Sequence, residues 1–151
     1  GEISNAKKVA WLICKHREEK EIETTEDLKE VTKSCHSKHE ENKFLAPLFQ
    51  ALRIEVNQEI EALKECLNDC YTVLKPGGRL VVISYHSLED RLVKNIIKSG
   101  NTEGIIERDA IYGSTTKVYK NLTTKPILPS ASEVEKNSRA RSAKLRVAEK
   151  I

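Results

Sequence analysis

The chain has 151 residues, which is enough for one domain or for one domain with a subdomain. Hydrophobic residues make up 38% of it and charged residues 32%, and no apolar run approaches the ~18 residues that cross a bilayer, so the composition excludes a membrane-spanning protein. Because 26 basic residues nearly balance 23 acidic residues, nucleic-acid binding has to be argued from local clusters of charge.

The N-terminal part of the chain has the pattern of a small helical domain. Apolar residues at helical spacing predict a helix over residues 4–20, with Ser4 as its N-cap. Thr24 and Asp27 have the spacing of a capping box, which predicts a second, shorter helix. Residues 36–43 are polar and are predicted to form a loop.

A long helix and a strand follow. Pro47 suits the first position of a helix whose apolar repeat continues to Leu74, where a Pro-Gly-Gly sequence stops it. Residues 80–83 are a short, continuously apolar run, which predicts a strand buried on both faces. Ser87 and Asp90 are predicted to cap the next helix. This order indicates a piece of an open α/β sheet.

The pattern is weaker in the last third of the chain. Two further strands are predicted at residues 117–119 and 143–149, the second of them half-exposed because apolar and basic residues alternate along it. A short helix capped by Ser132 is predicted between them.

Two polar clusters follow or precede predicted strands, where α/β sheets carry function. The first, SYHSLEDR, covers residues 84–91 and places His86 and a hydroxyl at a substrate cleft, or else it is only a helix cap and a loop. The second covers residues 137–146 and contains Arg139, Arg141 and Lys144. It either grips phosphates or forms a solvated, basic edge strand.

Four segments in order resemble one family. They are FQALRIEVN at 49–57, LKPGGRL at 74–80, SYHSLEDR at 84–91 and ARSAKLR at 140–146. Together they are similar to the rRNA small-subunit methyltransferase H family, and they match the later, C-terminal part of its pattern. The resemblance implies transfer of a methyl group from S-adenosylmethionine to N4 of a cytidine in small-subunit rRNA.

The resemblance also implies an architecture. Residues 49–151 would be the C-terminal half of a Rossmann-like methyltransferase sheet, and residues 1–48 an inserted helical subdomain. His86 and Ser87 would act at the target base, and Arg139, Arg141 and Lys144 would bind rRNA.

Three further residues, Arg53, Glu55 and Asn57, match the family's first motif. For them we favour a structural role, as an ion-paired and hydrogen-bonded junction between the helical part and the sheet.

Some residues depart from the family pattern, and these departures bear on the organism or organelle from which the protein comes. Bacterial members have Phe at Tyr85, Pro at Ser138 and another lead-in at residues 45–48. These differences favour a mitochondrial relative, with a bacterial-type cytoplasmic protein as the alternative. The four cysteines (Cys14, Cys35, Cys66 and Cys70) do not have the spacing of a disulfide framework, which favours a reducing compartment.

The family's Gly-rich cofactor loop has no counterpart in this sequence. The glycine pair Gly77-Gly78 precedes a predicted strand and reads as a tight turn. We therefore expect S-adenosylmethionine to act in the full-length enzyme and not to be bound by this chain alone. The chain by itself is expected to be inactive, and a non-catalytic RNA-binding or scaffolding fragment is the alternative function.

A zinc module is a third hypothesis, based on the Cys35-His36 and His39 segment with Cys14 or His16. The spacing matches no standard zinc finger, so we assign no metal ligands. Finally, the strand that would pair with Arg79–Ser84 on one side is expected to belong to the half of the enzyme that this chain lacks. The open edge of Arg79–Ser84 then predicts self-association.

Overall fold

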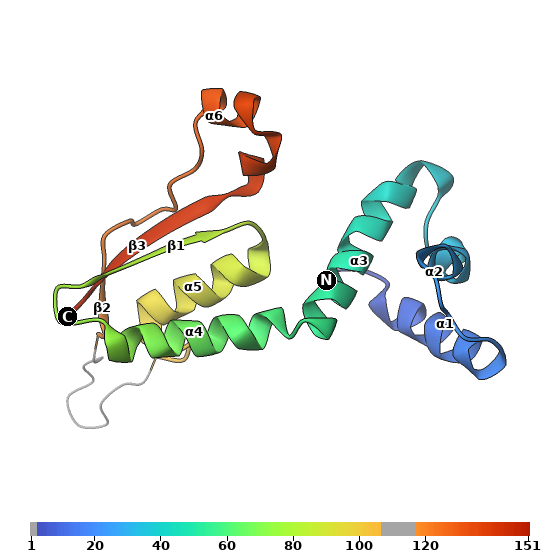
Figure 1. Cartoon of the computed structure of the whole chain (residues 1–151), viewed down its shortest axis with the longest axis horizontal. Coiled ribbons are helices and arrows are strands. Elements are labelled where there is room, and N and C mark those ends of the chain that lie inside the picture. The colour runs from blue at the N-terminus through green and yellow to red at the C-terminus, as the bar shows by residue number, and fades with distance from the viewer. Residues whose placement is uncertain (1–2, 107–116) are drawn as a thin grey trace. The chain divides into compact units, whose positions relative to one another are not determined.

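The computed structural model describes residues 3–106 and 117–151, and the chain divides into two compact units, 1–59 and 60–151 (Figure 1). The sequence had placed the domain boundary between residues 48 and 49, and the compact units divide after residue 59. The division lies later because a helix runs through that position and ends only at Val56.

The first unit is helical. It contains α1 (Ala6–Glu19), α2 (Thr25–Thr32) and α3 (Glu41–Val56), with short 3-10 turns at Lys33–Cys35 and Lys38–Glu40. Its core consists of one or two apolar residues from each helix: Val9, Leu28, Leu45 and Leu48. The predicted loop at 36–43 is only partly a loop, because the second 3-10 turn and the start of α3 lie within it.

The start of α1 differs from the prediction. Asn5 and not Ser4 occupies the N-cap, and it makes no capping side-chain bond. Its side-chain amide instead donates to the carbonyl of Cys35 at 2.9 Å, which ties α1 to the turn after α2.

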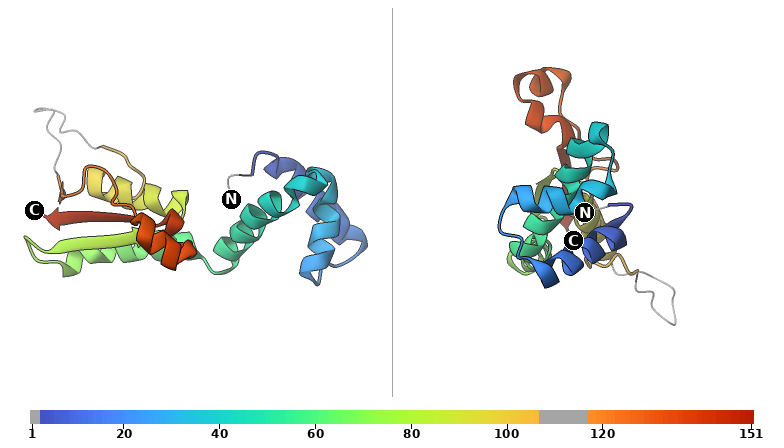
Figure 2. Two further views of the ribbon diagram at one scale, coloured as in Figure 1. Left: turned by 90° about the horizontal axis from the view of Figure 1, so that it is seen from above. Right: turned by 90° about the vertical axis from the view of Figure 1, so that its right-hand side faces the viewer.

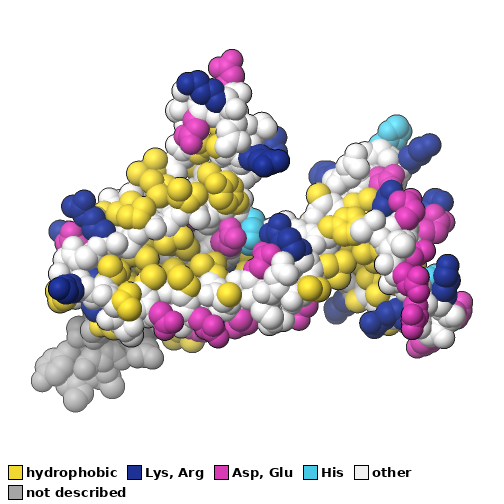
Figure 3. Space-filling view, in the orientation of Figure 1, with side chains coloured by type: hydrophobic (Ala, Val, Ile, Leu, Met, Phe, Trp, Pro, Cys, Tyr) yellow, Lys and Arg dark blue, Asp and Glu magenta, His cyan; other side chains and the backbone are white. Residues whose placement is uncertain are grey.

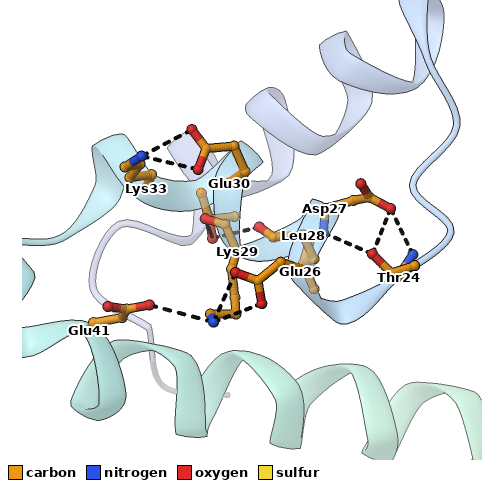
Figure 4. A network of polar contacts seen from close by, with 9 residues as sticks. Thr24, Glu26, Asp27, Leu28, Lys29, Glu30, Lys33 and Glu41 are labelled. Atoms are coloured by element: carbon orange, nitrogen blue, oxygen red, sulfur yellow. Dashed lines mark hydrogen bonds and ion pairs between the residues drawn. The ribbon is translucent and has the colours of Figure 1, made fainter.

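The predicted capping box of α2 is confirmed (Figure 4). The Thr24 hydroxyl accepts the N–H of Asp27 at 3.1 Å, and the Asp27 carboxylate accepts the N–H of Thr24 at 2.9 Å. The hydrogen bond from the Thr24 side chain is the main cause of a lowered pKa at Asp27. Two donors that the first turn of a helix leaves without partners are thus satisfied reciprocally.

The long helix predicted from Pro47 to Leu74 is wrong in two respects. Pro47 lies inside α3, and a break separates α3 from α4 (Glu59–Val73). At the break Gln58 has a left-handed backbone with φ of 52°. In the sequence the apolar repeat continues through the break. Val56, which belongs to this repeat, is nevertheless 80% exposed, so packing does little to keep the helix straight there.

Side chains predicted to form a junction lie at this break. Arg53 forms a forked pair with Glu59 at 2.8 and 3.0 Å, and the Asn57 amide donates to the same carboxylate at 3.1 Å. Glu55 is exposed and contributes its backbone carbonyl, which accepts from the Gln58 side chain at 2.7 Å. These contacts join the end of α3 to the first residue of α4.

The second unit is α/β, which agrees with the predicted fold class. Its described strands β1 (Arg79–Ser84), β2 (Tyr119–Asn121) and β3 (Lys144–Lys150) form an antiparallel sheet in the order β1-β3-β2. Helices α4 and α5 (Ser87–Ser99) pack on one face of it (Figures 1 and 2). The buried core takes residues from every layer: Leu67, Leu80, Val93, Ile96, Ile97, Tyr119 and Ala148.

The strand β1 is buried on one face only, contrary to the prediction. Leu80 and Ser84 are buried under the helices, whereas Val81 and Ile83 are 57% and 58% exposed. Their partners across the ladder, Val147 and Leu145, extend the same apolar face. Hydrophobic side chains accordingly gather on the surface over β1 and β3 (Figure 3). A continuous apolar run had suggested cover on both sides, and within the described residues only one side has it.

The last part of the described chain supplies the caps of two helices. Helix α6 (Ala131–Lys136) is capped by the Ser130 hydroxyl, which accepts the N–H of Glu133 at 3.2 Å, so Ser132 was the wrong cap. At the far end of β3, the Lys150 ammonium donates to the carbonyls of Tyr71 and Leu74 at 2.6 and 2.8 Å and thereby caps α4. No helix of the described residues is long and apolar enough to span a membrane.

Candidate functional site

The two polar clusters found in the sequence meet at one end of the sheet. Because β1 and β3 are antiparallel, the carboxyl end of β1 lies beside the start of β3, with Ser84 opposite Lys144. The first cluster follows β1 into α5, and the second leads into β3 through a 3-10 turn at Ser138–Ser142. The fold thus brings together residues that are far apart in the chain, such as Asp90 and Arg146, which are 56 residues apart.

Asp90 connects the two clusters. Its carboxylate accepts from Nε of Arg146 at 2.6 Å and from Nη2 at 3.1 Å, and the Lys144 ammonium lies 3.4 Å away. The side chains of Asp90 and Arg146 are only 12% and 11% exposed, whereas that of Lys144 is 39% exposed. A forked, nearly buried pair with a more accessible second cation fixes α5 to β3.

The same contacts set the charge of Asp90. Its hydrogen bonds with Arg146 hold the pKa of this carboxyl below its usual value, against the opposing effect of burial, and the charges of Arg146 and Lys144 act in the same direction. Asp90 is therefore an anion at neutral pH. Sequence reasoning had taken Asp90 as a helix-capping residue and had counted Arg146 only as part of the basic cluster at 137–146.

His86 occupies the N-cap of α5, where Ser87 and Asp90 had been predicted. Its Nδ1 accepts the N–H of Glu89 at 3.4 Å, and the Glu89 carboxylate accepts the N–H groups of Tyr85 and His86 at 2.9 and 3.3 Å. The Nε2 of His86 lies 3.0 Å from Glu89 without the angles of a hydrogen bond. Ser87 is exposed on the first turn of α5.

The basic residues are divided between two environments. Arg139 and Arg141 are exposed on the 3-10 turn, while Lys144 belongs to the Asp90 network on β3. Since β3 is the central strand of the sheet, the interpretation of this segment as a solvated edge strand is wrong.

Comparison with known proteins places this geometry in a family. The model of the MraW methylase family matches residues 1–151. The chain is 54% identical over 151 residues to the ribosomal RNA small subunit methyltransferase H of Parabacteroides distasonis, and 52% identical over 151 residues to that of Flavobacterium johnsoniae. All of this chain is covered, but only 49% of each relative, so the chain spans about half the length of the curated relatives it matches.

The chain belongs to the MraW methylase family. This confirms the family inferred from the four sequence motifs. The relatives are bacterial, so the mitochondrial origin was wrong, and the alternative of a bacterial-type cytoplasmic protein fits them. Two of the positions that had favoured mitochondria, Tyr85 and Ser138, are exposed to solvent. Exchanges at such positions cost little structurally and carry little information about origin.

An MraW methylase implies S-adenosylmethionine as the methyl donor of the complete enzyme. In the described structure the glycine pair of this chain does not form a loop that fits that cofactor. Gly77, with φ of 79°, and Gly78, whose added Cβ would lie 2.8 Å from the Lys75 carbonyl, form the turn before β1. A phosphate- or nucleoside-binding Gly-rich loop instead follows a strand and opens a helix.

The part of the chain that the structure describes holds no group of three or more His, Cys, Asp or Glu residues arranged for an ion. The ring of His36 lies against Phe44, with centroids 4.7 Å apart. Cys70 packs against the core of the α/β unit, where burial raises the pKa of its thiol.

Proposed function

We propose that this chain is part of an S-adenosylmethionine-dependent enzyme that methylates N4 of a cytidine in small-subunit rRNA. The observation that carries the proposal is identity above 50% along the whole chain to relatives named as small-subunit rRNA methyltransferases. The meeting of the His86 and Arg139–Lys144 segments supports it, because the His86 segment follows the carboxyl end of β1 and loops at strand ends commonly carry functional sites.

We further propose that this chain supplies the RNA-facing part and that the cofactor-binding half lies elsewhere in the protein. The relatives are about twice as long as the matched segment, which leaves room for it. Strand β1 also has one unpaired edge and one open face in the described structure. A Rossmann-like sheet that continues beyond β1, with helices on its second face, would cover both. Residues 1–59 would then be the inserted helical subdomain.

The chemistry requires orientation more than a strong base. The lone pair of the cytosine amine is delocalised into the ring, so the nitrogen has to be held in line with the methyl group while its proton is accepted. The base is reached as an unstacked or flipped nucleotide. In this proposal His86 and Ser87 orient the base, and Arg139 and Arg141 hold phosphates. Lys144 contributes its exposed ammonium from the Asp90 network.

The proposal is tested by methylation of small-subunit rRNA from cells that lack the gene. The complete protein should add one methyl group to a cytidine, read as N4-methylcytidine by nucleoside mass spectrometry. The 151-residue chain alone should show neither transfer nor heat of binding with S-adenosylmethionine. Methylation at another atom would refute the N4 assignment. Binding of the complete protein to rRNA without any transfer would favour the scaffolding alternative.

The role of His86 can be separated from its capping of α5. We expect His86→Ala to lose the cap, at about 1 kcal/mol of stability, whereas His86→Asn keeps an acceptor at that position. If His86 orients the base, both variants of the complete enzyme should lower the rate of transfer by about 10²-fold. Normal transfer by His86→Asn, with a loss only in His86→Ala, would make His86 a structural residue. Thermal unfolding of each variant supplies the stability readout.

A further inference from the structure

A second basic region adjoins the Asp90–Arg146 pair described above. A cavity of about 340 Å³ opens between α5 and the loop that follows β2. Four of the residues that line it are cationic: Lys94, Lys98, Lys125 and Arg146. Asn121 and Thr124 add an amide and a hydroxyl, and the described residues that line the cavity include no carboxylate.

The positive charge of this cavity is mostly uncompensated. Lys94 and Lys98 are one helical turn apart on α5, so their ammonium groups share a face and repel each other. Among the described residues no carboxylate pairs with Lys94, Lys98 or Lys125. Arg146 has an anionic partner, Asp90, which engages Nε and Nη2 and fixes the guanidinium in place.

The lining chemistry selects the class of ligand. Point charges on flexible stems, a fixed guanidinium and small polar groups are the donors that bind phosphate oxygens. Within the described structure no aromatic side chain lines the cavity, so it offers no surface on which a base would stack. This set of groups fits the backbone of a nucleic acid better than a nucleobase.

We propose that the cavity between α5 and the loop after β2 binds a phosphodiester of the substrate RNA. The proposal rests on the proposed function and assigns to that function a second contact point. Arg146 joins the two regions, because it lines this cavity and pairs with the Asp90 that also contacts Lys144. An RNA strand held here and at Arg139 and Arg141 would be gripped on two elements.

The test uses the complete protein and a fluorescent single-stranded RNA with the small-subunit rRNA sequence, titrated by anisotropy at several salt concentrations. The cavity variant is Lys94→Gln with Lys98→Gln, and the control, Lys7→Gln with Lys75→Gln, removes the same charge from exposed sites that do not line the cavity. We expect the cavity variant to bind more weakly and its logarithmic salt slope to fall by ~0.7 for each phosphate that it no longer neutralises. The control should keep the wild-type slope.

Three results would overturn the inference. One is a wild-type slope in the cavity variant, and another is an equal fall in affinity in the control. The third is unchanged RNA binding together with weaker binding of inorganic phosphate, which would assign the cavity to a free anion. A Lys125→Gln variant changes a loop residue, so it repeats the test without altering α5. Failure of the proposed function is distinct, since it appears as wild-type protein that does not methylate cytidine.

Discussion

Replacing Asp90 by Ala is expected to lower the free energy of unfolding by about 3 kcal/mol, the lower end of the range for breaking a buried ion pair. The variant leaves the Arg146 guanidinium, 11% exposed, without the carboxylate that accepts two of its hydrogen bonds. It also removes the contact that fixes α5 to β3. Urea unfolding followed by circular dichroism measures the change.

Two controls separate the charge from the packing. Lys144→Met removes the more exposed partner and should cost less than about 1 kcal/mol, as exposed pairs do. Adding Arg146→Met to Asp90→Ala removes the stranded cation and should recover part of the stability. If the double variant is as unstable as the sum of its single changes, the pair is not the source of the effect.

The contribution of Asp90 to the free energy of unfolding should depend on pH. Its folded-state pKa is lowered, chiefly by the hydrogen bonds with Arg146, so the stabilisation is present above the unfolded value of about 3.9 and is lost as pH falls through the folded value. The difference in unfolding free energy between wild type and Asp90→Asn should therefore be constant near neutral pH and shrink below about pH 4. A difference that persists in strong acid would contradict this assignment.

We expect the 151-residue chain alone to self-associate, and Ile83→Lys to return it to monomers. In the described sheet β1 is an edge strand, and its exposed Val81 and Ile83 form an apolar face with Leu145 and Val147. An unpaired edge beside such a face invites pairing with a second copy or an exchange of helices, and a lysine on the strand opposes both. Light scattering at micromolar concentration gives the mass.

The matched control is Val73→Lys, which places the same charge on an apolar residue that is 77% exposed at the end of α4. It should leave the association unchanged. A monomeric wild-type chain whose β1 amides are protected from hydrogen exchange would show that the chain covers this strand itself. The account of a missing neighbouring strand would then be wrong.

Local patterns in the sequence were sufficient where local interactions determine the structure. The Thr24–Asp27 capping box is formed by residues only three apart in the chain, and it was predicted correctly. The cap of α5 was misplaced by one residue because His86 and Glu89 have the same spacing as Ser87 and Asp90. Serine is the commoner cap, and propensity alone chose it.

Long-range pairing was beyond sequence reasoning. Nothing near Asp90 indicates that its partner is Arg146, since that contact depends on how β3 aligns with β1. The alternation of Arg146 with apolar neighbours on β3 was a usable signal, because it places this cation on the same face as residues that meet α5. The break at Gln58 was hidden for a different reason: an apolar repeat records spacing and not whether the helix continues.

The position of β3 in the chain has a consequence for how the α/β unit folds. This strand follows the other two described strands in the chain, yet it lies between them in the sheet and pairs with both. Strand β1 has no described partner until residues 144–150 emerge, so closing that long intervening segment should limit the folding rate. The end of β3 already hydrogen-bonds to Gly77 and Gly78, beside the start of β1. A permuted chain that begins at β3 and continues through a short link into β1 should therefore fold faster.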